Sequence, residues 1–277
     1  MKKQNKVFIN NIELSNKSKL VLIAGPCAIE SKSHAIEMAA KIREICNQVD
    51  INFIYKSSFD KANRTSILSK RGVGIDLAKE IFAEIKKLFN VPIITDVHEN
   101  QQCAEISDVI DVIQIPAFLC RQTNLLEAAS KTKKPIMVKK GQFMSPWETE
   151  NIIKKLVECG SDNILLCERG VSFGYNNLVS DMKSIPIMQK FGWPIVFDVT
   201  HSLQQPGGRG DKSGGQSEFI PHLARAATAV GVSSVFIETH DNPEKAISDG
   251  PNMLELKDLK FLLENLLEID NIVKKNV

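Results

Sequence analysis

The feature that most constrains the fold of this chain is a repeated alternation of short apolar segments with longer amphipathic ones. Eight apolar segments, most of them apolar on both faces and bounded by turn residues, predict strands. Segments with the 3.6-residue periodicity of helices lie between them, such as residues 33–48 and 146–160. The expected strands cover residues 20–25, 51–57, 91–97, 109–117, 134–140, 163–169, 194–200 and 232–239.

Buried strands that alternate with helices in this way predict an α/β protein whose parallel sheet closes into a (β/α)8 TIM barrel. An open, doubly wound sheet is the alternative, but the chain lacks the glycine-rich dinucleotide fingerprint typical of that fold. Two short segments before the first strand predict an N-terminal β-hairpin over residues 6–14. Because no linker or block of charge divides the chain, we expect residues 1–277 to form a single barrel domain.

Composition narrows the classes of function. The 277 residues include 35 basic and 33 acidic side chains, and a net charge of +2 favours neither nucleic acid nor an anionic membrane as a partner. No apolar run is long enough to span a membrane and no signal-peptide pattern is present, so we expect a cytoplasmic protein. Its six cysteines have no CxxC spacing, which indicates free thiols in a reducing compartment.

The predicted strand ends carry polar and ionisable side chains. In a (β/α)8 barrel the active site lies at the carboxyl ends of the strands, so these side chains are the first candidates for a functional site. In chain order they are Cys27, Lys56, Lys61, Asp96, His98, Gln114, Ala117, Lys139, Lys140, Glu168, Arg169, Asp198, His201, Glu238 and His240.

A metal site is predicted by four of the polar residues near the strand ends. Cys27, His201 and Glu238 follow the first, seventh and eighth strands, which closure of a barrel makes neighbours about 4.8 Å apart. Asp249, in the loop after the last strand, could supply a fourth ligand. This donor set suits zinc, iron(II) or manganese better than magnesium or calcium. The alternative is that these residues serve packing, capping and ion pairing without a metal.

A cluster of cations is expected at the same face. Burying a lysine is unfavourable unless it is paired, so the cluster indicates an anionic ligand, with room for more than one phosphate. The alternative is a structural network of ion pairs with neighbouring carboxylates. A buried lysine could also be the Schiff-base nucleophile of an aldolase, a reaction that has no use for the metal ligands. The six cations are Lys56, Lys61, Arg64, Lys139, Lys140 and Arg169.

The segment from His201 to Gln216 contains five glycines and no apolar periodicity. We predict that residues 202–216 form a mobile lid over the barrel mouth, which long loops of active sites commonly provide. The alternative is a surface loop without function.

Seven motifs, taken together, resemble the 3-deoxy-D-manno-octulosonate 8-phosphate synthases, and the resemblance covers almost the whole chain. It implies a homotetrameric transferase that condenses phosphoenolpyruvate with arabinose 5-phosphate and water during lipopolysaccharide precursor biosynthesis. The motifs are "KSSFDKANRTS" (56–66), "IITDVHE" (93–99), "QIPAFLCRQT" (114–123), "VKKGQF" (138–143), "CERG" (167–170), "FDVTHSLQ" (197–204) and "SDGPN" (248–252).

Asn63 bears on the choice of sugar. The related 3-deoxy-D-arabino-heptulosonate 7-phosphate synthases typically carry Lys-Pro-Arg-Thr where residues 61–65 here read Lys-Ala-Asn-Arg-Thr. Asn63 therefore favours the five-carbon sugar. A barrel that binds sugar phosphate without catalysis is a third possibility, which an intact set of ligands and lysines argues against.

The resemblance also implies roles for individual residues. Lys139 and Arg169 would hold the phosphate of phosphoenolpyruvate beside Gln114 and the backbone of Ala117, and Lys56 and Lys61 would face its carboxylate and enol. The sugar phosphate would bind Asn63, Arg64, Thr65 and, from a neighbouring subunit, Arg121. The residues expected to take part in catalysis are Lys56, Lys61, Asn63, Asp96 and His201.

Members of this family are either metal-dependent or metal-independent, and the latter carry asparagine at the position of Cys27. Cys27, Gly141 and Ser248 match the metal-dependent pattern. The resemblance therefore implies one divalent ion per subunit, held by Cys27, His201, Glu238 and Asp249.

Overall fold

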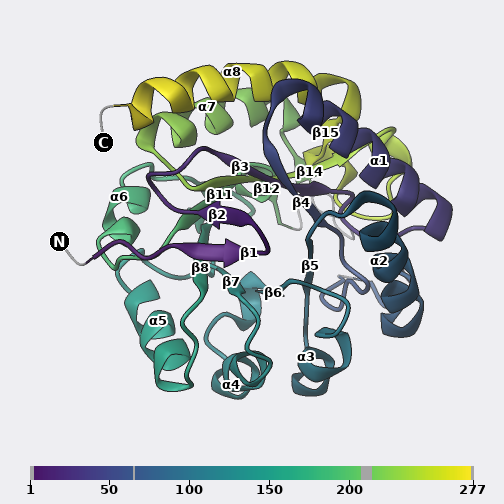
Figure 1. Cartoon of the computed structure of the whole chain (residues 1–277), viewed down its shortest axis with the longest axis horizontal. Helices are drawn as coiled ribbons and strands as arrows, with labels where there is room; N and C mark the ends of the chain where they lie inside the picture. The colour runs from purple at the N-terminus through teal and green to yellow at the C-terminus, as the bar shows by residue number, and fades with distance from the viewer. Residues whose placement is uncertain (1–2, 65, 207–213, 276–277) are drawn as a thin grey trace.

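The computed structural model describes residues 3–64, 66–206 and 214–275. Within these ranges, parallel strands follow one another in chain order around a ring, and the ring closes because the last strand pairs with both its predecessor and the first. Figure 1 shows this ring with helices around it, and the predicted (β/α)8 barrel is confirmed. Its strands are β3 (Val21–Gly25), β4 (Asn52–Lys56), β5 (Ile93–Asp96), β6 (Val112–Ile115), β7 (Ile136–Lys139), β8 (Ile164–Glu168), β11 (Ile195–Asp198) and β14 (Ser234–His240).

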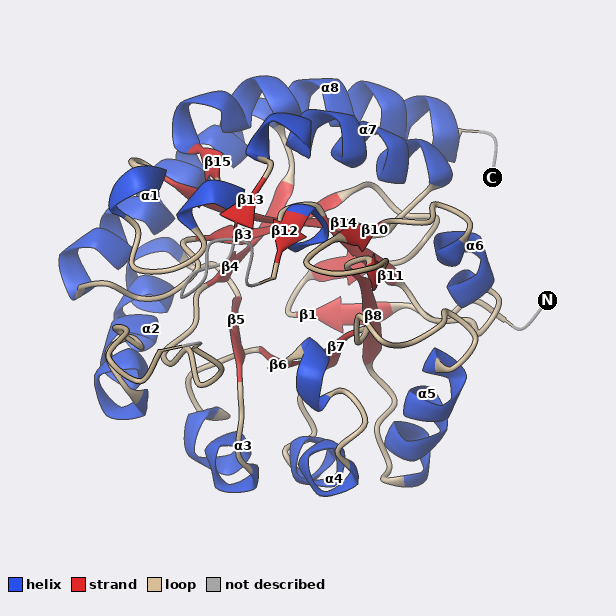
Figure 2. Cartoon of the chain, turned by 180° about the vertical axis from the view of Figure 1, so that it is seen from behind, coloured by secondary structure: helices blue, strands red, loops and turns tan. Residues whose placement is uncertain are grey.

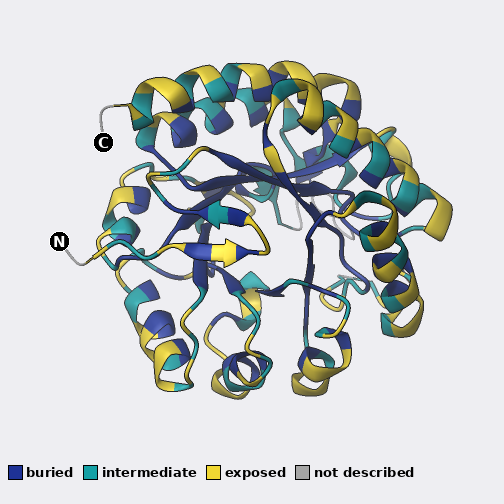
Figure 3. Ribbon diagram, in the orientation of Figure 1, coloured by how far each residue is buried: buried dark blue, intermediate teal, exposed yellow. Residues whose placement is uncertain are grey.

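The helices form the outer layer, and Figure 3 shows that their inner faces are buried while their outer faces are exposed. In α1 the buried residues Ala35, Met38, Ala39 and Ile42 recur at helical spacing, so one stripe packs on the barrel. The α-helices are α1 (Lys32–Val49), α2 (Ile75–Phe89), α3 (Asn100–Ile106), α4 (Thr123–Lys131), α5 (Thr149–Glu158), α6 (Ser184–Gln189), α7 (Ile220–Val230) and α8 (Leu256–Lys274). Short 3-10 helices are η1 (Ala117–Leu119), η2 (His201–Leu203), η3 (Ser217–Phe219), η4 (Pro243–Lys245) and η5 (Gly250–Asn252).

A hairpin of β1 (Val7–Ile9) and β2 (Ile12–Leu14) confirms the antiparallel pair expected within residues 6–14. It lies across the end of the barrel that faces the viewer in Figure 1. Asn16 fastens it there, because its amide donates to the carbonyl of Trp193 over 3.0 Å and accepts from the backbone of Ile195 over 2.8 Å, just where β11 begins. The hairpin therefore closes the end of the barrel at which the parallel strands start.

Short strand pairs lie at the opposite end, which faces the viewer in Figure 2. The chain forms β9 (Val171–Ser172), β10 (Leu178–Val179), β12 (Gln204–Gln205), β13 (Gly214–Gly215) and β15 (Leu254–Glu255) there. The pairing of β12 with β13 joins the two sides of the segment predicted as a lid. Residues 207–213 of that segment lie outside the described residues, so the lid stays a prediction.

Gly25 places the first two strands of the barrel unusually close at their carboxyl ends. A Cβ atom at this position would lie 1.9 Å from the backbone oxygen of Lys56, so no larger residue fits. This close approach puts Cys27, two residues further on, beside the end of β4.

All six cysteines are free, as the sequence predicts. Among the described residues, no helix is both long and apolar enough to cross a membrane.

Candidate active site

The carboxyl ends of the barrel strands surround a cavity of about 1020 Å³. Because parallel strands bring their carboxyl ends to one face, side chains from distant parts of the sequence meet there. The structure thus brings most of the predicted site residues together. Those that line the cavity are Lys56, Lys61, Asn63, Arg64, Asp96, Gln114, Ala117, Lys139, Arg169, His201 and Asp249.

Three predicted residues lie elsewhere, and a fourth is not among the described residues. Cys27 and Glu238 do not line the cavity; each is only 1% exposed and contacts residues that do. Arg121 is exposed outside the cavity, where its carbonyl accepts a hydrogen bond from Lys155. Thr65 lies outside the described residues.

Three of the four predicted metal ligands converge beside the cavity, and the fourth, His201, lies next to one of them. Ligand atoms of Cys27, Glu238 and Asp249 all lie within 4.8 Å of one another, and the Cys27 Sγ is 3.2 Å from Asp249 Oδ2. The fourth donor, His201 Nε2, lies 3.5 Å from Glu238 Oε2. A thiol and two carboxylates therefore form one cluster, and the His201 imidazole contacts this cluster through Glu238.

Asp198, at the end of β11, orients the histidine of this set. Its buried carboxylate lies 2.8 Å from His201 Nδ1 and accepts the backbone N–H of His201 over 2.9 Å. A proton held on Nδ1 leaves the lone pair of Nε2 directed at Glu238. Carboxylates commonly support metal-binding histidines in this way.

The charges of the donor set also fit a cation. Burial and the Glu238 carboxylate raise the pKa of Cys27, so the thiol keeps its proton without a compensating charge. Burial alone would raise the pKa of Glu238 as well, but Lys56 and His201 outweigh it and lower that pKa. Since a borderline divalent ion stabilises thiolate and carboxylate together, the residues fit the predicted metal.

Three of the predicted cations are held in buried ion pairs. Lys56 Nζ lies 2.7 Å from Glu238 Oε1, and Lys139 Nζ lies 2.5 Å from Asp198 Oδ2. Lys140 pairs with Glu168 over 3.3 Å and does not line the cavity, so for this lysine the structural network is the better description. Lys56 and Lys139, in contrast, are paired yet line the cavity.

Two further cations are poised for an anionic ligand. Burial would lower the pKa of Lys61, but the electrostatic influence of Cys27 and of the Glu238 and Asp96 carboxylates outweighs it and raises that pKa. Arg169 donates from Nη2 to Gln204 Oε1 over 3.0 Å, whereas its buried Nη1 has no hydrogen-bond partner among the described residues. Since buried donors are normally satisfied, Arg169 fits the edge of a binding site.

Arg64 joins two loops at the rim of the cavity. Its guanidinium donates to Ser248 Oγ over 3.1 Å and to the carbonyl of Ile247. Ser248 Oγ in turn donates to Asp249 Oδ2 over 2.9 Å, which connects Arg64 to a predicted metal ligand.

Asp96 is buried at the end of β5 and accepts hydrogen bonds from Ser58 and His98. Burial would raise the pKa of Asp96, but the His98 hydrogen bond and the Lys61 and Lys56 charges outweigh it, and that pKa is lowered well below its usual value. The Asp96 carboxylate therefore carries a negative charge on the cavity wall.

The sequence assigned no role to three residues that shape this site. Asp198 stood among the strand ends, so a signal for it existed. Gln204 bridges the site by accepting from Arg169 and donating to Asp249 Oδ1 over 2.9 Å. The Phe236 ring centroid lies 3.1 Å from Lys139 Nζ, a cation–π contact that an apolar strand residue does not reveal in sequence.

The fold and the site together define a barrel enzyme with candidate metal ligands beside a cationic cavity. Residues 2–275 match the family described as DAHP synthetase I, and the chain belongs to this family. It is 57% identical over 265 residues to a protein of Agrobacterium fabrum, with 96% of this chain and 94% of that protein covered. It is 56% identical over 271 residues to a protein of Bartonella bacilliformis, with 98% and 96% covered. Both relatives are named 2-dehydro-3-deoxyphosphooctonate aldolase.

Proposed function

We propose that this chain condenses phosphoenolpyruvate with arabinose 5-phosphate and water to form 3-deoxy-D-manno-octulosonate 8-phosphate and inorganic phosphate. The observation that carries the proposal is the cationic cavity beside a cluster of three candidate metal donors, which His201 contacts through Glu238. The name shared by the relatives supports the octulosonate product over the heptulosonate. Asn63, which distinguishes the two motifs, lines the cavity.

Phosphoenolpyruvate binds at the inner part of the cavity in this proposal. Lys139 and Arg169 hold its phosphate beside Gln114, and the unpartnered buried donor Arg169 Nη1 supports that assignment. Asp198 and the Phe236 ring contact the Lys139 ammonium group there and help to hold it in place. Lys56 and Lys61 face the carboxylate and enol.

Arabinose 5-phosphate binds at the rim, with its phosphate on Asn63, Arg64 and Thr65. Arg64 exchanges its contact with the loop at Ile247 and Ser248 for the phosphate when the sugar enters. We assign Arg121 to the same phosphate in a neighbouring subunit of a cytoplasmic homotetramer, which its exposed position outside its own cavity supports.

One divalent ion per subunit, held by Cys27, His201, Glu238 and Asp249, completes the proposal. Zinc, iron(II) or manganese in that place would polarise the sugar aldehyde or orient the attacking water. The Asp198 carboxylate keeps the Nδ1 proton of His201 in place and leaves Nε2 as the donor. Lys56 neutralises Glu238, which lowers the charge repulsion among the donors.

The chemistry requires two bonds to form at opposite ends of the enol. Carbon C3 attacks the aldehyde, water adds to C2 as positive charge develops there, and the hemiketal phosphate collapses with loss of phosphate. Lys61 and Asp96 both line the cavity, and each influences the pKa of the other. In the proposal, Lys61 stabilises the negative charge of the substrate carboxylate, and Asp96 stabilises the positive charge that develops at C2.

Phosphate release from phosphoenolpyruvate, measured with arabinose 5-phosphate and with erythrose 4-phosphate in parallel, tests the proposal. We expect turnover with arabinose 5-phosphate to exceed turnover with erythrose 4-phosphate by at least about tenfold, which corresponds to 1.4 kcal/mol. Equal rates would contradict the choice of sugar. Absence of turnover with either sugar, when divalent metal is supplied, would favour the barrel that only binds sugar phosphate.

A further inference from the structure

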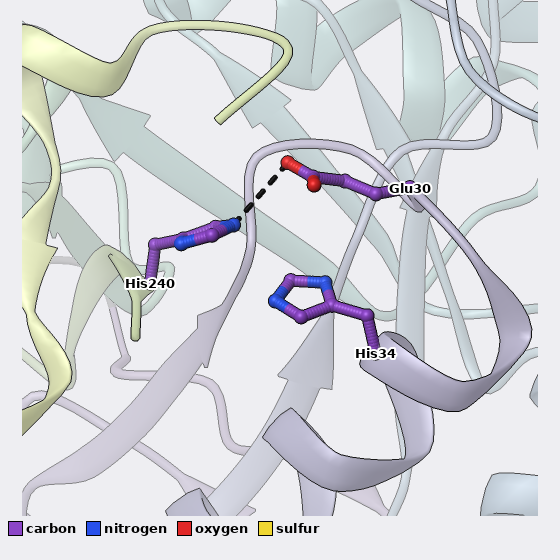
Figure 4. A group of neighbouring side chains, drawn as sticks. All are labelled: Glu30, His34 and His240. Atoms are coloured by element: carbon purple, nitrogen blue, oxygen red, sulfur yellow. Dashed lines mark hydrogen bonds and ion pairs between the residues drawn. The ribbon is translucent and has the colours of Figure 1, made fainter. Parts of the chain in front are cut away.

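A second group of metal-binding side chains lies outside the cavity. Glu30 follows β3, His34 stands in the first turn of α1, and His240 ends β14. Each of the three offers one ligand atom, and these atoms all lie within 4.8 Å of one another. Figure 4 shows the three side chains converging from separate segments of the chain. None of them lines the cavity of the candidate active site.

His34 is already in the form that a metal requires. Its Nε2 lies 3.0 Å from Asp241 Oδ1, so the proton of the neutral ring belongs on Nε2. The other nitrogen, Nδ1, is buried and has no hydrogen-bond partner among the described residues. A buried lone pair without a donor is unusual, and here it lies in a cluster with an imidazole and a carboxylate.

Asp241 supports both histidines. Its Oδ1 lies 3.0 Å from His34 Nε2 and 3.0 Å from His240 Nδ1. Burial would raise the pKa of Asp241, but the hydrogen bond from His34 and the electrostatic influence of the two neighbouring histidines outweigh it, and that pKa is lowered. An ionised carboxylate behind each ring is the arrangement that commonly orients metal-binding histidines.

His240 needs one proton to move before it can bind a metal. At present its Nε2 lies 3.2 Å from Glu30 Oε1, and its Nδ1 accepts the backbone N–H of Asn242 over 2.9 Å. A cation that takes the Nε2 lone pair shifts the ring proton to Nδ1, where Asp241 accepts it. The amide of Asn242 then gives up its bond to the ring, so binding carries a modest cost.

We propose that Glu30, His34 and His240 bind a second divalent cation, with zinc the best match. Two imidazoles and one carboxylate are a common zinc ligand set, and water can complete it because Glu30 and His34 retain 22% and 18% exposure. The ion would tie the start of α1 to the end of β14. These segments carry Cys27 and Glu238 three and two residues before Glu30 and His240, so the second ion braces the backbone of the proposed catalytic metal site.

Metal stoichiometry of the full-length chain tests the second site. Metal-free protein is equilibrated with buffered Zn²⁺ and its bound zinc is counted by elemental analysis. We expect two zinc ions per wild-type chain, one in Cys27→Ala, one in His34→Gln and none in the double variant. Asp241→Asn should weaken the second site about 10–100-fold, as loss of an outer carboxylate typically does.

Cobalt distinguishes the two sites by their ligands. With Co²⁺ as the probe, Cys27→Ala should keep visible ligand-field bands but lack the thiolate charge-transfer band. His34→Gln should keep the thiolate charge-transfer band and lose only the ligand-field bands of the second site. Glu30→Gln repeats the test with a near-isosteric side chain if His34→Gln does not fold. Thermal unfolding of each metal-free variant checks the fold.

Variants of His34 and Glu30 that bind as much zinc as the wild-type chain, or a Cys27→Ala chain that binds none, would overturn the second site. The single zinc ion expected in Cys27→Ala is independent of the proposed condensation, since no turnover enters the measurement. Failure of the proposed function would therefore leave this result unchanged.

Discussion

At the N-terminal end of the barrel the hairpin buries Val7, Ile9 and Leu14, whereas at the C-terminal end the buried side chains include Lys56, Asp198 and Glu238. The hairpin stabilises its end through apolar burial, which is favourable wherever it occurs. The other end buries charges, which is unfavourable unless each charge is paired. One barrel thus separates an end that contributes stability from an end whose paired charges are kept for chemistry.

This contrast between the two ends explains which features of the protein could be predicted from its sequence. The barrel and the hairpin were predictable because the periodicities of helices and the short apolar segments of strands are local signals. The predicted strand over 109–117 was too long, since β6 covers Val112–Ile115 and Pro116 follows it. An ion pair between a strand-end lysine and Asp198 was one of the possibilities considered, but the contact of Lys139 with Phe236 was not predictable, because an apolar strand residue gives no sign of it.

The largest effect on turnover is expected for Cys27→Ala. This change removes the thiol and offers neither a ligand nor a hydrogen-bond donor, so we expect activity to fall by more than about 100-fold, beyond the loss typical of outer-shell changes. Cys27→Asn should keep measurable activity that a chelator no longer abolishes. Steady-state rates and metal content, measured for all three proteins, check both expectations. Near wild-type activity in Cys27→Ala would remove Cys27 from the ligand set.

The second largest loss of turnover is expected for Lys139→Ala. Removing one partner of a desolvated charge pair typically costs about 2–5 kcal/mol, so phosphoenolpyruvate binding and turnover should both fall. Calorimetric titration with phosphoenolpyruvate measures the loss. Lys61→Ala serves as the comparison at the other end of the same substrate. Unchanged affinity in Lys139→Ala would assign this lysine to the structural ion-pair network.

At the opposite end, Leu14→Ala should leave the rate per folded chain unchanged. Truncating this fully buried side chain leaves a cavity, and we expect unfolding to become easier by about 2–5 kcal/mol. Denaturant unfolding together with initial rates separates the two effects. A lower rate at full folding would mean that the hairpin influences the chemistry and that the two ends are coupled.

The smallest effect is expected on the free energy of unfolding when the hairpin residue Glu13 is protonated at acid pH. Hydrogen bonds from Ser18 and Lys6 lower the pKa of Glu13 below its usual 4.5, so its contribution to stability is present above that pH and is lost as the pH falls through the folded-state value. Glu13→Gln should reduce this acid-dependent loss by at most about 1 kcal/mol.

Asp96→Asn is the matched change at the other end. The pKa of Asp96 is lowered well below 3.8, so its contribution is likewise present above the unfolded value and lost below it. Because Asp96 is buried, we expect Asp96→Asn to change the pH dependence of the free energy of unfolding more than Glu13→Gln does. Equal slopes for the two variants, from urea unfolding between about pH 3 and pH 7, would contradict the contrast between the ends.

Turnover of the wild-type chain before and after complete metal removal tests most directly whether the charged end is a metal-assisted condensation site. Phosphate release from phosphoenolpyruvate and arabinose 5-phosphate should stop when a chelator has removed the metal, and should return when zinc, iron(II) or manganese is added back. Full activity in protein shown by elemental analysis to be free of metal would contradict the account.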